Sequence, residues 1–266
     1  KLGVVEDTLF VPMLGRIYAS EYCPQILYDK KALELKNKLP SDLIEQNKQN
    51  QYTLLASASR SANMDRFIQS FLERRPDGVI VQLGCGLETT YYRCDNGKTC
   101  WYAVDLPHVI EYRRGLLPEP EREFYISGDA FAKDWIKKVR NDVLDAPILV
   151  IAGGLFHYFE EHKVVALLRM IRQFGNMEVV FDTVNKKGMA MMQKKYMKQV
   201  GHADAQMFFY VDSAKELAAK IGSNAKVIAE EPYYRYIPKN GLKMSTKVSM
   251  AVSDWFCMVK MIQLKL

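Results

Sequence analysis

The chain has 266 residues, of which 48% are hydrophobic and 26% are charged. This length can bury a sizeable core, and the composition favours a soluble globular protein. The formal net charge is +6, but the basic residues are spread along the chain and interleaved with acids. Such a pattern is typical of solvated helix faces, so we expect no nucleic-acid partner. No apolar run approaches the about 18–20 residues that span a bilayer, so we expect no membrane partner either.

The five cysteines are odd in number and scattered, which favours reduced thiols in a cytoplasmic protein. Cys94 and Cys100 are too far apart for a zinc knuckle, and no second Cys/His pair accompanies them. We therefore expect no metal site. No signal peptide is visible, and the expected localisation is cytoplasmic.

Residues 1–75 are predicted to form a helical cap. Asp42 and Glu45 have the spacing of a capping box. Apolar residues then recur at helical spacing, namely Met64, Phe67, Ile68 and Phe71. The segment from Arg74 to Gly78, which contains a proline and a glycine, ends this helical part.

From residue 79 onward, strands and helices are predicted to alternate. Strands are expected at 79–84, 101–105, 123–127, 147–152, 177–183, 225–230 and 255–264, and helices at 131–143, 160–174, 187–200 and 213–221. This alternation indicates βαβ units and a mostly parallel sheet. The last run alternates apolar and polar residues, as an antiparallel edge strand does. We expect residues 76–266 to form one compact unit with the cap.

The most informative motif is a glycine turn after the first predicted strand, Val79-Ile-Val-Gln-Leu-Gly-Cys-Gly-Leu-Glu88. Glycine at 84 and 86 lets a ligand approach the backbone closely. The next strand ends in Asp105, 19 positions after Gly86. A carboxylate there can accept hydrogen bonds from both hydroxyls of a ribose. The pattern predicts a site for a nucleoside cofactor.

Two further observations bear on which cofactor it is. Thr89 stands where a dinucleotide fingerprint has its third glycine, which disfavours a pyrophosphate and favours S-adenosylmethionine. A nicotinamide-dependent oxidoreductase is the alternative. Asp129 follows the third strand, where it can accept a hydrogen bond from an adenine amino group. Alternatively, Asp129 caps a helix that begins at Phe131.

Several segments together resemble the leucine carboxyl methyltransferase family, which includes polyketide-synthesis O-methyltransferases of the tetracenomycin type. They are Arg60-Ser-Ala-Asn-Met-Asp65, Leu83-Gly-Cys-Gly-Leu-Glu-Thr-Thr-Tyr-Tyr-Arg93, Val104-Asp-Leu-Pro-His-Val-Ile110, Gly128-Asp-Ala130 and Ile151-Ala-Gly-Gly-Leu-Phe-His-Tyr-Phe159. The resemblance covers roughly residues 10–185. It implies a class I methyltransferase of the α/β class: a Rossmann-like, seven-stranded, mostly parallel sheet with an antiparallel last strand, and an N-terminal helical cap.

The resemblance also implies a cofactor-binding set. The family's arginine at the position of Arg60 holds the methionyl carboxylate of S-adenosylmethionine, a task suited to a permanently charged guanidinium. The expected set is Arg60, Gly84, Cys85, Gly86, Asp105, Leu106, Asp129, Ala130 and Gly153.

The chain departs from the family pattern at two positions. Gly153-Gly154 replaces the usual Glu-Gly, which removes an acceptor near the amino group of the cofactor. Glu88 replaces the common aspartate of the glycine turn. The first departure leaves three outcomes open: weaker binding, replacement by backbone carbonyls, or a non-catalytic S-adenosylmethionine-binding protein of the same fold.

Methyl transfer to a hydroxyl requires alignment and removal of a proton. His157 follows the fourth strand and is the candidate general base; the alternative is a histidine hydrogen-bonded under the cap. Tyr158 matches a family tyrosine that lines the substrate side, with core packing as the alternative. Arg16 and Tyr18 are further candidates for acceptor contacts. The expected function is O-methylation of a small-molecule hydroxyl or carboxyl group, and a carboxylate needs no base.

The predicted helix at 187–200 has two interpretations. Met189, Met192, Tyr196 and Val200 form an apolar stripe that favours packing on the sheet. Its lysines, Lys194, Lys195 and Lys198, could instead form a rim that attracts an acidic substrate.

Overall fold

The structure, a computed structural model, describes residues 5–39, 49–199 and 206–266. Within these ranges the strands form a seven-stranded sheet in the order β3-β2-β1-β4-β5-β7-β6. The strands are β1 (Val79–Leu83), β2 (Trp101–Asp105), β3 (Glu123–Ser127), β4 (Ile148–Ala152), β5 (Met177–Val184), β6 (Lys226–Pro232) and β7 (Val259–Lys265). Strands β1 to β5 pair in parallel, which confirms the predicted sheet.

β7 runs antiparallel to both of its neighbours, β5 and β6, as expected for the last strand. The prediction that it lies at an edge is wrong, because β6 is the edge strand. Of the three polar residues that suggested an exposed face, Lys265 is exposed, but Lys260 and Gln263 are buried with partners. Lys260 Nζ donates to Glu230 Oε1 over 2.8 Å, and Gln263 Nε2 donates to Glu178 Oε2 over 2.6 Å.

The helices are α1 (Val5–Tyr22), α2 (Lys30–Leu35), α4 (Gln51–Arg74), α5 (Thr90–Cys94), α6 (Pro107–Leu116), α7 (Asp134–Val143), α8 (Glu161–Arg172), α9 (Lys186–Gln199), α10 (Ala214–Ile221) and α11 (Met244–Trp255), with 3-10 turns at Lys36–Lys38 and Phe156–Tyr158. The four helices predicted after residue 130 are present with shifted ends. The expected start of the last strand at residue 255 is wrong, because α11 ends there. The capping box at Asp42 and Glu45 lies outside the described residues.

Alternate residues along the strands pack into two separate cores, one on each face of the sheet. Val79, Val81 and Leu83 of β1 face α7, α8 and α10. Ile80, between them, faces the other way and packs in a core with buried residues of α4. α4 therefore belongs to the sheet's own core as well as to the N-terminal helices.

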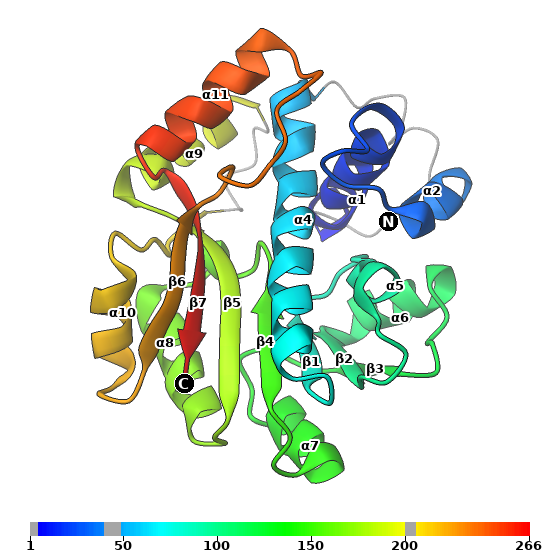
Figure 1. Ribbon diagram of the computed structural model, residues 1–266, viewed down its shortest axis with the longest axis vertical. Coiled ribbons are helices and arrows are strands. Elements are labelled where there is room, and N and C mark those ends of the chain that lie inside the picture. Colours follow the sequence, from blue (N-terminus) through cyan, green and yellow to red (C-terminus); the bar gives the residue numbers. More distant parts are fainter. Residues whose placement is uncertain (1–4, 40–48, 200–205) are drawn as a thin grey trace.

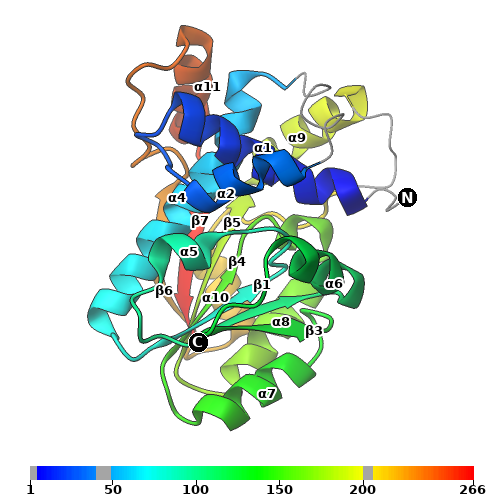
Figure 2. The ribbon, with the colours of Figure 1, turned by 90° about the vertical axis from the view of Figure 1, so that its right-hand side faces the viewer.

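Figures 1 and 2 place α1, α2, α9 and α11 at the end of the sheet toward which β1 to β5 point. The carboxyl ends of these parallel strands thus meet beneath the N-terminal helices. In parallel α/β sheets, ligands bind at this edge.

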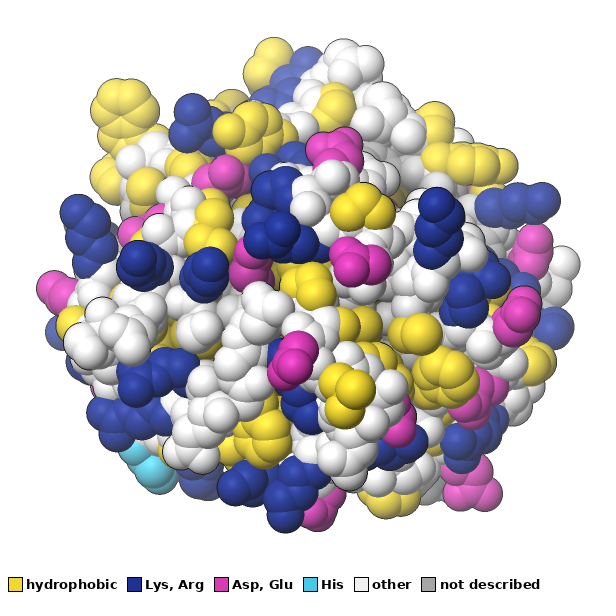
Figure 3. All heavy atoms as spheres, turned by 60° about the horizontal axis from the view of Figure 1, so that its bottom comes forward, with side chains coloured by type: hydrophobic (Ala, Val, Ile, Leu, Met, Phe, Trp, Pro, Cys, Tyr) yellow, Lys and Arg dark blue, Asp and Glu magenta, His cyan; other side chains and the backbone are white. Residues whose placement is uncertain are grey.

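The opposite end of the molecule is shown in Figure 3, where basic and acidic side chains are interspersed. In the ranges that the structure describes, no helix combines the length and the apolar character needed to cross a bilayer.

Candidate functional site

The glycine turn after β1 needs glycine at both positions. Gly84 has φ of +60° and Gly86 has φ of +46°, the left-handed region that other residues rarely adopt. A Cβ at Gly84 would lie 2.9 Å from Leu155 Cδ1, and one at Gly86 would lie 3.1 Å from Leu9 Cδ2. The turn is therefore packed between the loop after β4 and helix α1.

Asp105, at the end of β2, is hydrogen-bonded to this turn. Its Oδ2 accepts from Gly86 N over 2.8 Å, and its Oδ1 accepts from Leu106 N over 2.8 Å. Burial raises the pKa of Asp105, while these two backbone bonds act in the opposite direction. Each carboxylate oxygen keeps a further lone pair for a ligand hydroxyl. The structure thus brings together the turn and the acid that the sequence predicted.

The other residues of the predicted cofactor set play different parts. The Cys85 side chain is buried against Ala103, Ile110 and Tyr125, so only its backbone can face a ligand. Asp129 is exposed, and its Oδ1 accepts from Phe131 N over 2.8 Å. This bond makes a turn and not a helix start, because α7 begins at Asp134.

Arg60 lies against the Gly153-Gly154 turn that follows β4. A Cβ at Gly153 would lie 3.2 Å from Arg60 Cδ, and one at Gly154 would lie 2.8 Å from Arg60 Nη1. Arg60 Nε donates to Asp182 Oδ2 of β5 over 2.8 Å. The Arg60 side chain is still 27% exposed. The Gly153-Gly154 turn is therefore in close contact with this arginine.

Asp182 is the functional candidate that sequence reasoning missed. It is 1% exposed, and its Oδ1 accepts from Gly154 N over 2.6 Å. Burial alone would raise the pKa of this carboxyl group, but Arg60 and His157 hold it well below its usual value. The available signal was an acid within a mostly apolar strand, since a buried acid must be paired.

The two predicted catalytic residues lie in the 3-10 turn after β4. His157 is 4% exposed, and its Nε2 lies 3.2 Å from Asp182 Oδ2. Tyr158 is half-buried against a small apolar cluster of Val184, Met189 and Met207. His157 thus contacts the Arg60–Asp182 pair directly.

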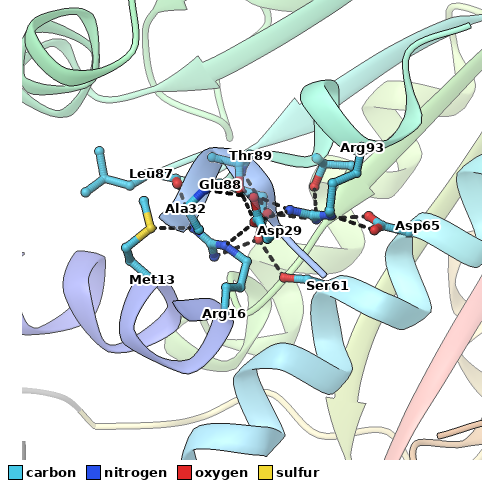
Figure 4. A network of polar contacts seen from close by, with 12 residues as sticks. Met13, Arg16, Asp29, Ala32, Ser61, Asp65, Leu87, Glu88, Thr89 and Arg93 are labelled. Atoms are coloured by element: carbon cyan, nitrogen blue, oxygen red, sulfur yellow. Dashed lines mark hydrogen bonds and ion pairs between the residues drawn. The ribbon is translucent and has the colours of Figure 1, made fainter. Parts of the chain in front are cut away.

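A second polar network joins the glycine turn to the N-terminal helices (Figure 4). Glu88 accepts hydrogen bonds from Arg16 Nη1 and Arg93 Nη2, each over 3.0 Å. Arg93 also pairs with Asp65 of α4, and Asp29 pairs with both arginines. Burial would raise the pKa of Glu88, but the two arginines hold it well below its usual value. The network connects segments that are distant in the sequence.

This network revises the expectation for Arg16, which is 1% exposed and also donates to Leu87 O over 2.7 Å. Arg16 is therefore a structural residue and not an acceptor contact. Tyr18 is half-buried, and its hydroxyl accepts from Gln51 Nε2 over 3.2 Å. Lys194 is exposed, while the side chains of Lys195 and Lys198 lie outside the description.

The described residues hold no group of three or more His, Cys, Asp or Glu side chains arranged to bind a metal ion. The groups that could contact a ligand at this edge of the sheet are instead the backbone of two glycine turns, separate carboxylates and one arginine. Such a set suits an organic ligand with a ribose and a charged tail.

The strand order, the antiparallel β7 and the glycine turn beside Asp105 define a class I methyltransferase fold. Solved structures share it. A protein of Thermobifida fusca YX assigned as a methyltransferase gives a TM-score of 0.60 at 14% identity, covering 100% of this chain and 99% of its own. The magnesium protoporphyrin IX methyltransferase of Synechocystis PCC 6803, solved with bound SAH, gives 0.51 at 10% identity, covering 89% and 99%.

The chain belongs to the leucine carboxyl methyltransferase family, whose sequence model matches residues 5–172. It is 30% identical over 186 residues to the tetracenomycin polyketide synthesis O-methyltransferase TcmP of Streptomyces glaucescens. That match covers 69% of this chain and 67% of TcmP. Both findings confirm the resemblance noted in the sequence. They make the protein an S-adenosylmethionine-dependent methyltransferase and disfavour the oxidoreductase alternative.

Proposed function

We propose that the protein transfers a methyl group from S-adenosylmethionine to an oxygen atom of a small molecule, in the cytoplasm. The observation that carries this proposal is the placement of two charged groups along one edge of the sheet. Asp105 lies beside the glycine turn after β1, and Arg60 lies over the glycine turn after β4. The similarity to TcmP, an O-methyltransferase, supports transfer to oxygen.

The residues at this edge fit the parts of the cofactor. Asp105 has acceptor capacity for the ribose hydroxyls, and the exposed Asp129 can accept from the adenine amino group. Leu106 is 44% exposed and can pack on the adenine ring. Arg60 can pair with the methionyl carboxylate. The remaining members of the set are Gly84, Cys85, Gly86, Ala130 and Gly153, which contribute backbone contacts. When bound, the cofactor supplies a methyl group on a positively charged sulfur.

The chain lacks the family's glutamate at position 153, but another acid lies at the turn after β4. Asp182 Oδ1 accepts from Gly154 N, so a carboxylate lies at the same turn but comes from β5. This favours an active enzyme over the alternative, a non-catalytic cofactor-binding protein.

Isothermal titration calorimetry with S-adenosylhomocysteine tests the proposal. The wild-type protein is expected to bind, and Asp105→Ala is expected to weaken binding by about 1–3 kcal/mol, the cost of losing hydrogen bonds to a charged group. Asp77→Ala is the matched control, because Asp77 is exposed before the amino end of β1 and should leave the affinity unchanged. Folded wild-type protein that shows no binding at millimolar ligand would refute the proposal. Binding without turnover on a panel of acceptors would favour the non-catalytic alternative.

A further inference from the structure

Arg60, the arginine over the glycine turn after β4, has a long side chain that needs to be held in one direction. Asp182 Oδ2 accepts from Arg60 Nε over 2.8 Å, which fixes the side chain at one atom of its guanidinium. Ordering a flexible side chain when a ligand binds lowers the affinity, so an arginine that is already fixed binds a carboxylate more tightly. The residues that restrain Arg60 therefore bear on cofactor binding.

Tyr233, which directly follows β6, contacts the part of α4 that carries Arg60. Its side chain is buried, and its hydroxyl donates to Ala56 O over 2.9 Å. Ala56 lies four residues before Arg60, so in a regular helix its carbonyl also accepts from Arg60 N. A tyrosine hydroxyl has one proton to donate. Because that proton is used on Ala56, the phenol oxygen of Tyr233 remains an acceptor.

The phenol of Tyr233 also interacts with the guanidinium of Arg60. Burial raises the pKa of Tyr233, and Arg60 acts in the opposite direction through its charge and through a hydrogen bond with the phenol. Burial would lower the pKa of Arg60, but Asp182 and then Tyr233 act against this effect. Arg60 thus has two buried partners, a carboxylate from β5 and a neutral phenol from the end of β6.

The backbone of Tyr233 is fixed to the same helix and to the sheet. Asn63, which is buried three residues after Arg60, donates from Nδ2 to Tyr233 O over 2.7 Å. Tyr233 N donates to Val259 O, at the start of β7, over 3.2 Å. Tyr233 is therefore bonded to α4 one turn before Arg60 and again just after it, and it links this part of α4 to the sheet.

We propose that Tyr233 is a positioning residue, which holds the guanidinium of Arg60 in the direction that meets the methionyl carboxylate of S-adenosylmethionine. This inference rests on the proposed function, in which Arg60 pairs with that carboxylate. Asp182 and Tyr233 order the arginine before the cofactor arrives, while 27% of its side chain stays exposed for the ligand. Tyr233 acts through Arg60 and not by contact with the cofactor.

Isothermal titration calorimetry with two ligands tests this role. S-adenosylhomocysteine carries the amino acid group, whereas 5′-methylthioadenosine has the same adenosine and sulfur without that group. We expect Tyr233→Phe to weaken S-adenosylhomocysteine binding about five- to tenfold, the contribution of one ordinary hydrogen bond. The affinity for 5′-methylthioadenosine should stay within about twofold, because this ligand has no carboxylate for Arg60.

Tyr234→Phe is the matched control. Tyr234 is the neighbouring residue and is equally buried, but its hydroxyl is hydrogen-bonded with Tyr52 and not with Arg60. The control should leave both affinities within about twofold. Equal losses for the two ligands in Tyr233→Phe, or equal losses in the two variants, would show a merely structural role and overturn the inference. An unchanged affinity for S-adenosylhomocysteine in Tyr233→Phe would overturn it as well.

A double-mutant cycle tests whether Tyr233 acts through Arg60. In an Arg60→Met background, Tyr233→Phe should cause no further loss of S-adenosylhomocysteine affinity, whereas additive losses would overturn the inference. Nitrogen-15 relaxation of cofactor-free wild type does not depend on the folding of any variant. We expect an order parameter of about 0.85 for Arg60 Nε, and one below about 0.6 would overturn the inference. Wild-type protein that does not bind S-adenosylhomocysteine would instead refute the proposed function.

Discussion

Replacing Glu88 with glutamine changes the charge of the buried network and keeps its shape. Four donors converge on the carboxylate of Glu88. Oε2 accepts from Arg16 Nη1 at 3.0 Å and from Ser61 Oγ at 2.8 Å. Oε1 accepts from Thr89 N at 2.9 Å and from Arg93 Nη2 at 3.0 Å. In Glu88→Gln one oxygen becomes an NH2 group, so two donors would face another donor.

The magnitude follows from the two hydrogen bonds lost with this one acceptor oxygen. Each buried donor left unpaired costs about 1–3 kcal/mol. The Glu88 side chain is 18% exposed, so water relieves part of this loss. We expect Glu88→Gln to lower the free energy of unfolding by about 2–4 kcal/mol, which is below the full cost of breaking a buried ion pair.

Urea denaturation measures this loss, with Glu34→Gln as the control. Glu34 forms an exposed ion pair with Lys31, and such pairs contribute at most about 1 kcal/mol. A Glu88→Gln loss no larger than that of the control would refute the reasoning.

The pH dependence gives a second check on Glu88. The pKa of Glu88 lies below its unfolded value, so its ionised form stabilises the fold above about pH 4.3. This contribution is lost as the pH falls toward the folded pKa. The difference in stability between wild type and Glu88→Gln should therefore be complete at pH 7 and shrink below about pH 4. A difference that grows in acid would contradict the assignment.

Two more predictions concern the glycine turn. Gly84→Ala should destabilise more than Gly97→Ala in urea. Both glycines have positive φ, so an alanine at either position costs about 1–2 kcal/mol of stability in the left-handed region. Only at residue 84 would the added Cβ meet a neighbour, Leu155 Cδ1 at 2.9 Å. Equal losses would show that the turn tolerates crowding. Cys85 is buried and its pKa is raised by that burial, whereas Cys257 is exposed. A thiol reagent at pH 8 should therefore show a fast phase that Cys257→Ser reduces; a fast phase abolished by Cys85→Ser would contradict this.

The parts of the site that could be predicted from the sequence are those whose motif residues lie close together along the chain. Gly86 and Asp105 are 19 residues apart. Gly86 lies in the turn just after β1 and Asp105 is the last residue of β2, and both strands are apolar runs that are easily recognised in the sequence. Their meeting follows from the geometry of parallel strands, because carboxyl ends lie at one edge. β1, β2 and β4 were predicted for the same reason, since each is a mostly apolar run bounded by turn residues.

The missed parts depend on contacts between distant segments. Arg60 and Asp182 are 122 residues apart, and nothing near either residue indicates that they pair. Lys260 and Gln263 were misread as an exposed face because their partners, Glu230 and Glu178, come from the neighbouring strands. α11 lacked a clear signal because Met244, Val248, Val252 and Trp255 are apolar but exposed, which obscures the contrast between its two faces.

The network around Glu88 also limits how this protein can be recombined with its relatives. Arg16, Asp29 and Asp65 come from the helical segment before residue 75, whereas Glu88 and Arg93 come from the segment after it. A chimera that joins this N-terminal segment to another relative's sheet would bury charges without their partners. Changes in acceptor preference made by exchanging whole helices should therefore succeed only where both halves of the network are exchanged together. Point changes away from these five residues avoid that constraint.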